Sequence, residues 1–299
     1  MQDKKLDILI LGGAGRLASS LASAWEKKHN VTTLSRTQLD IGNPHQLESA
    51  LDQRPFDILV NGAAFTNVDL CETERETARL INATAVGQMA KIASKRAARL
   101  IHFSTDYVFD GSLPRPLTEE DIPTPASWYG KTKLEGEELV LSTDPRHIAV
   151  RVSWVFGPAK PSFIDAILKR ARTESHVEAV NDKFSSPTYA EDCAEWLAPF
   201  LQPSSNGGLY HACNSGSCSW REYGAKALEL AAAAGIPLAT TEVGGITLAH
   251  MKQFVAPRPV YTLLDTSKLA RTTGITPRPW ETALKDYIQT HHASLSSAS

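Results

Sequence analysis

Close to its first residue, the 299-residue chain reads Asp7-Ile8-Leu9-Ile10-Leu11-Gly12-Gly13-Ala14-Gly15-Arg16-Leu17-Ala18. The residues up to Leu11 predict a buried strand, and an amphipathic helical pattern begins directly after the glycines. Gly12 and Gly15 lack the Cβ atoms that would occupy the space of a pyrophosphate at such a turn. The helix N-terminus offers N–H groups and the positive end of a dipole to phosphates. This arrangement favours a dinucleotide site over an empty structural turn.

Short apolar runs alternate with helical patterns through the first half of the chain. Strands are predicted at 7–11, 30–34, 57–61, 100–104 and 148–152, and helices at 17–28, 44–53, 73–97 and 129–141. Strands separated by helices of this length imply right-handed crossovers and a parallel sheet covered on both faces. The predicted fold class is therefore α/β, with a doubly wound parallel sheet of the Rossmann type.

The second half of the chain has a looser pattern. Beyond Trp154, Gly, Pro and Ser cluster around 157–162 and 185–187, with amphipathic helical segments between them. These breaks predict a smaller, mixed α/β lobe. We expect residues 1–155 to form an NAD(P)-binding Rossmann domain to which later segments return. Residues 156–299 are expected to form mainly a substrate-binding lobe.

The charge balance excludes some classes of partner. Lys and Arg number 31 and Asp and Glu number 33, so the formal net charge is −2 and no positive field holds nucleic acid or an anionic membrane.

The apolar run at 6–11 is too short for an export signal, and no run has the length of a membrane span. The four cysteines form no CxxC pair, which favours free thiols. We expect a cytoplasmic protein, either a monomer or a homodimer.

The end of the second predicted strand bears on the choice of cofactor. An NAD site usually has an acidic residue there for the ribose 2′-hydroxyl, whereas an NADP site has a cation nearby. This chain has Leu34-Ser35-Arg36. Ser35 can hydrogen-bond a 2′-phosphate, and the Arg36 guanidinium can bind it through charge-assisted bonds. NADPH is the expected cofactor, with NADH as the other possibility.

A tyrosine and a lysine lie one turn apart at the start of a predicted helix, in Tyr129-Gly130-Lys131-Thr132-Lys133. Residues i and i+4 share a helix face, so Tyr129 and Lys133 can reach the same ligand. An ammonium near the phenol favours phenolate, so we expect a lowered tyrosine pKa that suits an acid at neutral pH. Thr105 ends the fourth strand, where its hydroxyl can orient a substrate carbonyl. With the nucleotide fingerprint, these residues predict a ketoreductase.

Longer motifs resemble the dTDP-4-dehydrorhamnose reductase family, a branch of the extended short-chain dehydrogenase/reductases. The most specific are STDYVFDG at 104–111 and YGKTKLEGE at 129–137. The resemblance covers nearly the whole chain and extends to 61–69, 151–157, 187–188, 208–211, Trp220 and 256–259.

The resemblance implies that NADPH reduces the C4 ketone of a nucleotide-linked deoxysugar, converting dTDP-4-dehydrorhamnose to dTDP-L-rhamnose. Tyr129 would protonate the C4 oxygen, Lys133 would tune the phenol and hold the nicotinamide ribose, and Thr105 would position the ketone. The substrate-contacting residues would be Thr105, Asp106, Tyr107 and Trp154, with Arg258 as our candidate for the diphosphate. The expected cofactor-binding residues are Gly12, Gly15, Arg16, Leu17, Ser35, Arg36, Asp40, Ile41, Ala63, Ala64, Phe65, Thr66, Tyr129 and Lys133.

Two stretches depart from the family pattern. Family members commonly have Asp-Gln-x-Gly-x-Pro-Thr where this chain has Asp182-Lys183-Phe184-Ser185-Ser186-Pro187-Thr188, a difference at the nucleotide end of the substrate pocket. Some relatives dimerise through magnesium held by glutamates, one of them in the first helix. Here that stretch is Ala18-Ser19-Ser20-Leu21, so no metal is expected.

Two alternative functions remain open. One is another nucleotide-sugar 4-ketoreductase with different stereochemistry or a different nucleotide. The other is a non-catalytic, NADP-binding regulatory subunit resembling that of methionine adenosyltransferase. The presence of Thr105, Tyr129 and Lys133 argues against a purely regulatory role.

Overall fold

A six-stranded parallel sheet forms the centre of the molecule, with strand order β10-β5-β4-β3-β1-β2. The computed structural model describes residues 5–202 and 204–292. The predicted doubly wound α/β fold is confirmed, and the five predicted strands agree with the observed ones to within one residue at each end. The strands of the sheet are β1 (Asp7–Leu11), β2 (Asn30–Leu34), β3 (Ile58–Asn61), β4 (Arg99–Thr105), β5 (Ile148–Val152) and β10 (Gly208–His211).

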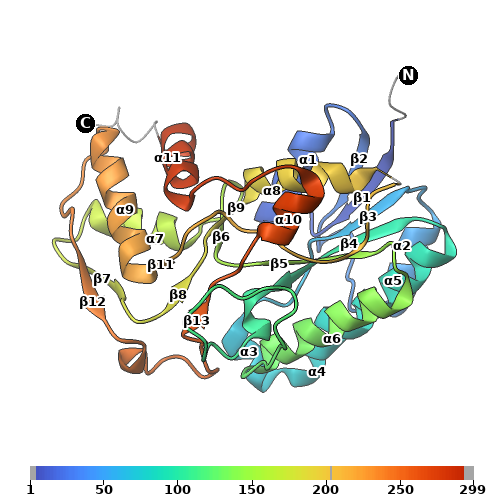
Figure 1. Ribbon diagram of the computed structural model, residues 1–299, viewed down its shortest axis with the longest axis horizontal. Helices are drawn as coiled ribbons and strands as arrows, with labels where there is room; N and C mark the ends of the chain where they lie inside the picture. Colours follow the sequence, from blue (N-terminus) through green and yellow to red (C-terminus); the bar gives the residue numbers. More distant parts are fainter. Residues whose placement is uncertain (1–4, 203, 293–299) are drawn as a thin grey trace.

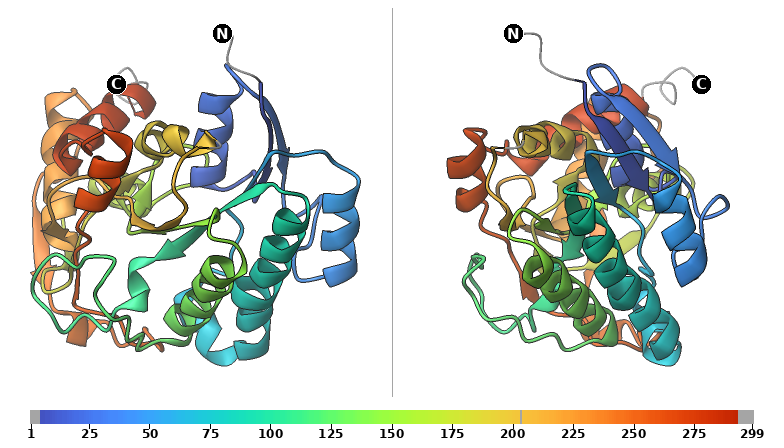
Figure 2. Two further views of the ribbon diagram at one scale, coloured as in Figure 1. Left: turned by 45° about the vertical axis from the view of Figure 1, so that its right-hand side comes forward. Right: turned by 90° about the vertical axis from the view of Figure 1, so that its right-hand side faces the viewer.

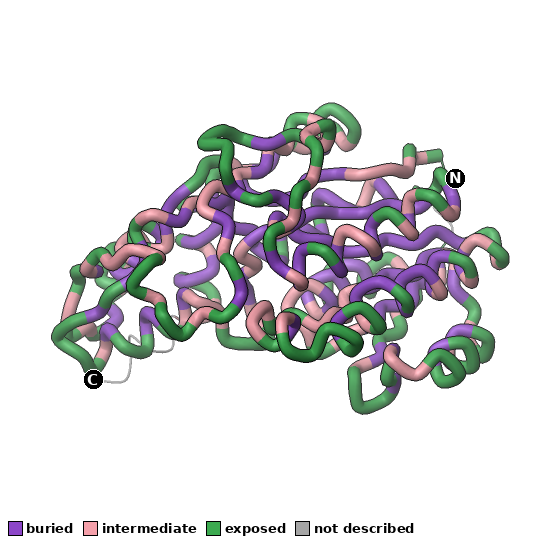
Figure 3. Tube along the Cα trace, turned by 90° about the horizontal axis from the view of Figure 1, so that it is seen from below, coloured by how far each residue is buried: buried purple, intermediate pink, exposed green. Residues whose placement is uncertain are grey.

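Helices cover both faces of this sheet (Figure 1). In β1, Ile8 and Ile10 belong to one buried apolar cluster, while Leu9 and Leu11 belong to another, because successive side chains point to opposite faces. Figure 3 shows the buried strands running between more exposed layers. One face is covered by α1 (Arg16–Trp25), α8 (Ala190–Leu197) and α10 (Ser267–Thr273), and the other by α2 (Pro44–Asp52), α5 (Ala85–Lys95) and α6 (Trp128–Thr143).

The helix predicted at 73–97 is interrupted in the structure. The segment forms α3 (Val68–Thr73), α4 (Arg75–Arg79), the π-helical turn η1 (Leu80–Thr84) and then α5. The wider turn contains the fully buried Asn82. Its side chain accepts a hydrogen bond from the Phe65 N–H at 2.8 Å and donates to the Phe65 carbonyl at 3.1 Å. The turn therefore anchors the loop that follows β3.

A second lobe lies beside the sheet (Figure 2). One three-stranded sheet and two parallel two-stranded sheets accompany its helices. No helix in residues 5–202 and 204–292 is long and apolar enough to cross a membrane. β10 and α8 lie with the central sheet, and the division at 155/156 stays a prediction. The remaining elements are η2 (Asp106–Val108), β6 (Val155–Phe156), α7 (Phe163–Ala171), β7 (Val177–Val180), β8 (Phe184–Ser185), β9 (Thr188–Tyr189), η3 (Ala198–Leu201), β11 (Cys218–Ser219), α9 (Trp220–Ala233), β12 (Val243–Ile246), η4 (Leu248–His250), β13 (Tyr261–Thr262) and α11 (Trp280–His291).

A buried ion pair fixes α6 to the sheet. Arg151 on β5 donates two hydrogen bonds to the Glu137 carboxylate on α6, at 2.5 and 2.9 Å. Both side chains are at most 3% exposed. The guanidinium also lies 5.0 Å from the centre of the Phe109 ring. Because α6 carries both Tyr129 and Lys133, this pair helps to set their positions relative to the strand ends.

Candidate active site

A cleft of about 550 Å³ opens at the carboxyl ends of β1, β2, β3 and β4. Ligands of open α/β sheets bind at this edge. Except for Ser35, all the predicted cofactor residues line the cleft, which brings them together from the glycine turn, the second strand end, the loop after β3 and the start of α6. These lining residues are Gly12, Gly15, Arg16, Leu17, Arg36, Asp40, Ile41, Ala63, Ala64, Phe65, Thr66, Tyr129 and Lys133.

The glycine turn fits an anionic ligand, although the role of Gly12 differs from the expected one. Gly12 has φ +80°, and a Cβ there would lie 2.8 Å from the backbone of Gly62 and Ala63. The protein's own packing therefore demands this glycine. Among residues 5–202 and 204–292, no side chain caps the N-terminus of α1, and no acidic residue lies in its first turn. The helix end lining the cleft can thus donate to a pyrophosphate.

The two residues after β2 differ in their surroundings. The Ser35 hydroxyl bonds within its own turn, to Thr37 at 2.8 Å and Gln38 at 2.9 Å, and does not line the cleft. Arg36 is exposed and lines the cleft. The guanidinium of Arg36 is thus the better placed of the two for a 2′-phosphate.

Arg16 connects the glycine turn to the second lobe. Its guanidinium donates to the carbonyls of Val155, Lys160 and Pro161 at 3.1, 2.9 and 2.6 Å. The side chain therefore holds one wall of the cleft against the other.

Tyr129 lines the cleft and shares a hydrogen bond with Thr105, which does not itself line it. Ser127 caps α6 by accepting the Gly130 N–H at 3.1 Å. A Cβ on Gly130 would lie only 2.2 Å from the Tyr107 carbonyl oxygen, so the helix start is in backbone contact with the segment after β4. Burial raises the pKa of Tyr129, opposed by its hydrogen bond with Thr105. The expected lowering of the phenol pKa is absent, and Tyr129 is a protonated phenol at neutral pH.

Lys133 also lines the cleft, although its side chain is almost wholly buried. Its Nζ is 2.5 Å from the Phe103 carbonyl oxygen and 3.2 Å from Nε2 of His102. Burial lowers the pKa of Lys133 to about 7, although the Glu137 carboxylate acts in the opposite direction. Near neutral pH, a large share of the Lys133 side chains is therefore the neutral amine.

The hydrogen bonds around His102 explain how a neutral amine is accommodated. The Ala63 N–H donates to the Asn61 carbonyl oxygen at 3.1 Å, which turns the Asn61 amide NH₂ toward Nδ1 of His102 at 3.0 Å. Nδ1 must then be the acceptor, so the neutral imidazole carries its proton on Nε2. That N–H faces Lys133, which can accept it only as an amine. Burial and the neighbouring Lys133 lower the pKa of His102, which keeps the ring neutral.

Replacing Lys133 with methionine should reduce the pH dependence of stability. Between pH 7 and the ordinary lysine pKa, the unfolded chain binds a proton that the folded chain lacks, so wild-type stability rises with pH. Relative to Lys133→Met, the wild-type free energy of unfolding should increase by about 1.4 kcal/mol per pH unit between roughly pH 7.5 and 9.5. Urea titrations at a series of pH values measure this difference.

Two further variants control for this result. Lys131→Met removes an exposed lysine from the same helix and should leave the wild-type pH dependence unchanged. Asn61→Asp replaces the donor facing Nδ1 with an acceptor, so the imidazole proton moves to Nδ1 and the Lys133 ammonium is stabilised. The pH dependence should then weaken. Parallel pH profiles for wild type and Lys133→Met would contradict the neutral amine.

The predicted substrate residues occupy three different environments. Asp106 is buried, and its carboxylate accepts hydrogen bonds at 2.7–3.2 Å from Thr105, Ser153, Ser185 and Thr262. These contacts join the end of β4 to β8 and β13. Tyr107 packs edge-on against Tyr129, with ring centres 5.7 Å apart. The carboxylate of Asp106 thus acts within a hydroxyl cluster that orients Thr105.

The other two predicted substrate residues, Arg258 and Trp154, contact different parts of the protein. Arg258 pairs with Asp69 at 2.7 Å and lies 4.4 Å from the centre of the Phe254 ring. Its guanidinium is largely engaged within the protein. Trp154 has the unusual backbone angle φ +42° and lines a second, aromatic cavity.

Three residues of this region were not among the predicted site residues. His102 and Asn61 form the hydrogen-bond chain to Lys133, and Lys183 is fully buried with its Nζ 2.5 Å from the Pro259 carbonyl oxygen. The Lys183 Nζ is also 5.1 Å from the centre of the Tyr107 ring. Lys183 could have been found from the sequence, because it is a charged residue at a position where this chain departs from the family motif. His102 and Asn61 could have been found because they are polar residues within apolar strands.

In the described parts of the chain, no group of three or more His, Cys, Asp or Glu side chains could hold a metal ion. All four cysteines are buried and free.

Comparisons with known proteins agree on one family. The family model described as the RmlD substrate binding domain matches residues 6–293. The chain is 35% identical to dTDP-4-dehydrorhamnose reductase of Escherichia coli K12, over 94% of this chain and 96% of that protein. It is 34% identical to the spore coat polysaccharide biosynthesis protein SpsK of Bacillus subtilis, with the same coverage.

A solved structure gives the same result. The dTDP-4-dehydrorhamnose reductase of Bacillus anthracis in complex with NADP has a TM-score of 0.88 and 28% sequence identity to this chain. The match covers 96% of this chain and 99% of the Bacillus protein.

Proposed function

The chain belongs to the dTDP-4-dehydrorhamnose reductase family, an oxidoreductase family, and on that premise we propose that it uses NADPH to reduce the C4 ketone of a nucleotide-linked deoxysugar. The proposed substrate is dTDP-4-dehydrorhamnose, and the product is dTDP-L-rhamnose. The observation that carries the proposal is the buried Tyr129 phenol beside Thr105, at the end of a cleft whose other end is an uncapped helix N-terminus.

The residues of the chain have separate tasks in this reaction. Bound NADPH would supply the hydride. Tyr129, kept protonated by burial, would donate to the ketone oxygen and transfer its proton to it, while Thr105, whose own hydroxyl proton is donated to Asp106, would position the ketone beside the phenol. Lys133 would hold a ribose hydroxyl with the N–H group that it does not donate to the Phe103 carbonyl. Asp106 would keep the Thr105 hydroxyl in position.

The test of this proposal is turnover with a defined substrate. We expect NADPH oxidation when dTDP-4-keto-6-deoxyglucose is supplied together with a 3,5-epimerase, and dTDP-L-rhamnose as the product. Turnover without the epimerase would instead identify a different 4-ketoreductase. Absence of turnover with either mixture, together with tight binding to a synthetase, would identify a regulatory subunit.

One observation favours the alternative that the enzyme is a different nucleotide-sugar 4-ketoreductase. Lys183 places a buried amine against the Tyr107 ring, at the point where the sequence departs from the family motif. A change of this kind would act on the predicted substrate residue Tyr107 while Tyr129 and Lys133 stay in place. Identification of the sugar product separates the two reductases.

Arg36→Ala should reduce the preference for NADPH over NADH. Loss of charge-assisted bonds to a 2′-phosphate should lower the ratio of kcat/KM for NADPH to that for NADH by about 10- to 100-fold. Lys91→Ala, an exposed change on α5 and away from the cleft, serves as the control. An unchanged ratio in Arg36→Ala would remove this residue from cofactor recognition.

We further propose that the enzyme works in the cytoplasm. Its four buried free cysteines suit a reducing compartment, where thiols persist.

A further inference from the structure

A buried lysine connects three segments that carry predicted substrate residues. Lys183 immediately precedes β8, and its side chain is fully buried. Its Nζ donates to the carbonyl of Pro259, the residue after Arg258, at 2.5 Å. The same Nζ lies 5.1 Å from the centre of the Tyr107 ring and 6.0 Å from the centre of the Trp154 ring. One side chain therefore links the segment after β4, the segment after β5 and the segment before β13.

The surroundings of Lys183 support a charged amine in spite of its burial. In the described parts of the chain, the Pro259 carbonyl is the one acceptor within hydrogen-bond distance of Nζ. The ring faces attract a cation, most strongly where water is excluded. Burial lowers the pKa of Lys183 to about 8, the Asp106 carboxylate acts in the opposite direction, and Arg258 adds to the lowering. The ammonium is therefore the main form at pH 7, and the amine is the main form at pH 9.5.

The two rings near Lys183 are coupled to the reacting hydroxyls. Tyr107 packs edge-on against Tyr129. Trp154 follows Ser153, whose hydroxyl donates to Asp106 at 2.8 Å, and the Thr105 hydroxyl donates to the same carboxylate. A change in the position of either ring therefore acts next to the groups that would meet the sugar.

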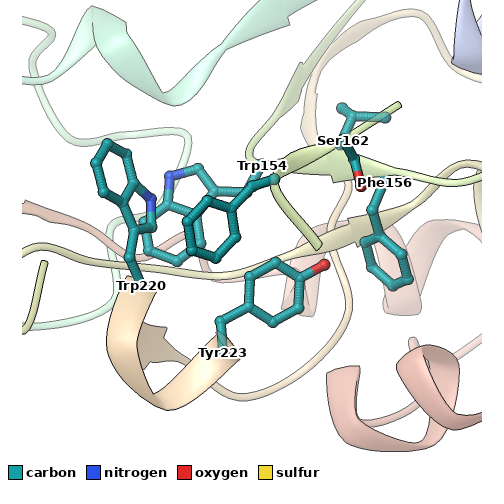
Figure 4. Close-up of a pocket in the computed structure, with 7 residues that line it drawn as sticks. Trp154, Phe156, Ser162, Trp220 and Tyr223 are labelled. Atoms are coloured by element: carbon teal, nitrogen blue, oxygen red, sulfur yellow. The ribbon is translucent and has the colours of Figure 1, made fainter. Parts of the chain in front are cut away.

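Trp154 also forms part of the second lobe. Its ring centre lies 5.8 Å from that of Trp220 and 6.2 Å from that of Tyr223 (Figure 4). These rings line the aromatic cavity, which has a volume of about 150 Å³. The backbone of Trp154 has φ +42°, a strained conformation that surrounding contacts must maintain. Lys183 lines neither this cavity nor the cofactor cleft, so any effect on a ligand must pass through the rings.

We propose that Lys183, as an ammonium, is a positioning residue that holds the Tyr107 and Trp154 rings in the arrangement that receives the sugar. The inference rests on the proposed function for the substrate class. The glutamine common in the family at this position is neutral and cannot make the same cation–π contacts. The charge on Lys183 should therefore govern the affinity for the nucleotide sugar and leave proton transfer to Tyr129.

The test measures the affinity for dTDP-L-rhamnose by calorimetry at pH 7 while NADP⁺ saturates the cofactor cleft. Lys183→Met keeps an unbranched side chain and removes the charge, so the dissociation constant should rise by about 3- to 30-fold. Lys183→Gln introduces the residue common in the family and should show the same loss, even if the methionine variant folds poorly. Lys169→Met removes an exposed lysine from α7 and should retain wild-type affinity.

The pH dependence separates the charge of Lys183 from its packing. Between pH 7 and 9.5, the wild-type dissociation constant should approach that of Lys183→Met, because the amine replaces the ammonium. The titratable groups that face Lys183 are Asp106, Arg258 and Tyr107. Aspartate and arginine ordinarily titrate far outside this range, and burial raises the pKa of Tyr107. Titration of Lys133 is common to both proteins and cancels in the ratio of their dissociation constants.

The outcomes separate this inference from the proposed reaction. Wild type that fails to bind dTDP-L-rhamnose, equal affinity in wild type and both Lys183 variants, or a ratio of dissociation constants that does not change with pH would each overturn the positioning role. None of these results requires turnover, since dTDP-L-rhamnose carries no ketone. If its binding depends on Lys183 but no nucleotide sugar is reduced, the positioning role stands and the proposed function fails. With an active substrate, Lys183→Gln should raise KM and change kcat by less than about 2-fold.

Discussion

Tyr129→Phe should lower kcat by about 100-fold or more. The change removes the proton donor and keeps the ring that packs edge-on against Tyr107. Because burial raises the pKa of Tyr129, the wild-type phenol is protonated throughout the neutral range and is ready to donate. The affinity for NADPH, measured by fluorescence titration, should change by less than about 2-fold, since only one hydroxyl at the reacting end is lost.

A control variant and a stability measurement test this prediction further. Tyr210→Phe removes a phenol hydroxyl remote from the cleft and should retain wild-type kcat. An intact thermal midpoint in Tyr129→Phe excludes misfolding as the cause of lost activity. A loss of only about twofold would mean that another group donates the proton.

Glu137→Gln should lower the free energy of unfolding by about 3–5 kcal/mol. The substitution keeps the size of the side chain but leaves the Arg151 guanidinium buried without a counter-charge. Urea unfolding followed by circular dichroism measures the loss as a lower midpoint with an unchanged slope.

The matched comparison is the double variant Glu137→Leu with Arg151→Met. Replacing both charges by apolar groups of similar size removes the burial penalty as well as the attraction, so most of the lost stability should return. If the single and double variants were equally stable, an unpaired buried charge would not be the cause of the lost stability. If Glu137→Gln were as stable as wild type, the ion pair would make no net contribution.

The sequence predicted the central sheet well, because the physical cause is local. Strands covered on both faces must be apolar at nearly every position, and 8–11 and 58–60 have that composition. The predicted cofactor residues, apart from Ser35, also line one cleft, since parallel strands bring their carboxyl ends to one edge.

Other features depend on contacts between distant segments and have no local signature. The π-helical turn at Leu80–Thr84 keeps a helical sequence pattern, while its Asn82 contacts Phe65 and Thr132, which lie far away in the sequence. The expected effect of Lys133 on Tyr129 followed from their spacing on one helix. In the structure, Lys133 instead hydrogen-bonds His102 and the Phe103 carbonyl, which no spacing rule could indicate.

The backbone contact at Gly130 bears on how such an enzyme can diversify. With only a hydrogen atom separating α6 from the Tyr107 carbonyl, the two reacting hydroxyls share a rigid frame that tolerates no larger residue. The aromatic cavity and the segment 182–188 lie outside this contact. Side chains there can therefore change one at a time, while the frame that holds the two hydroxyls stays the same.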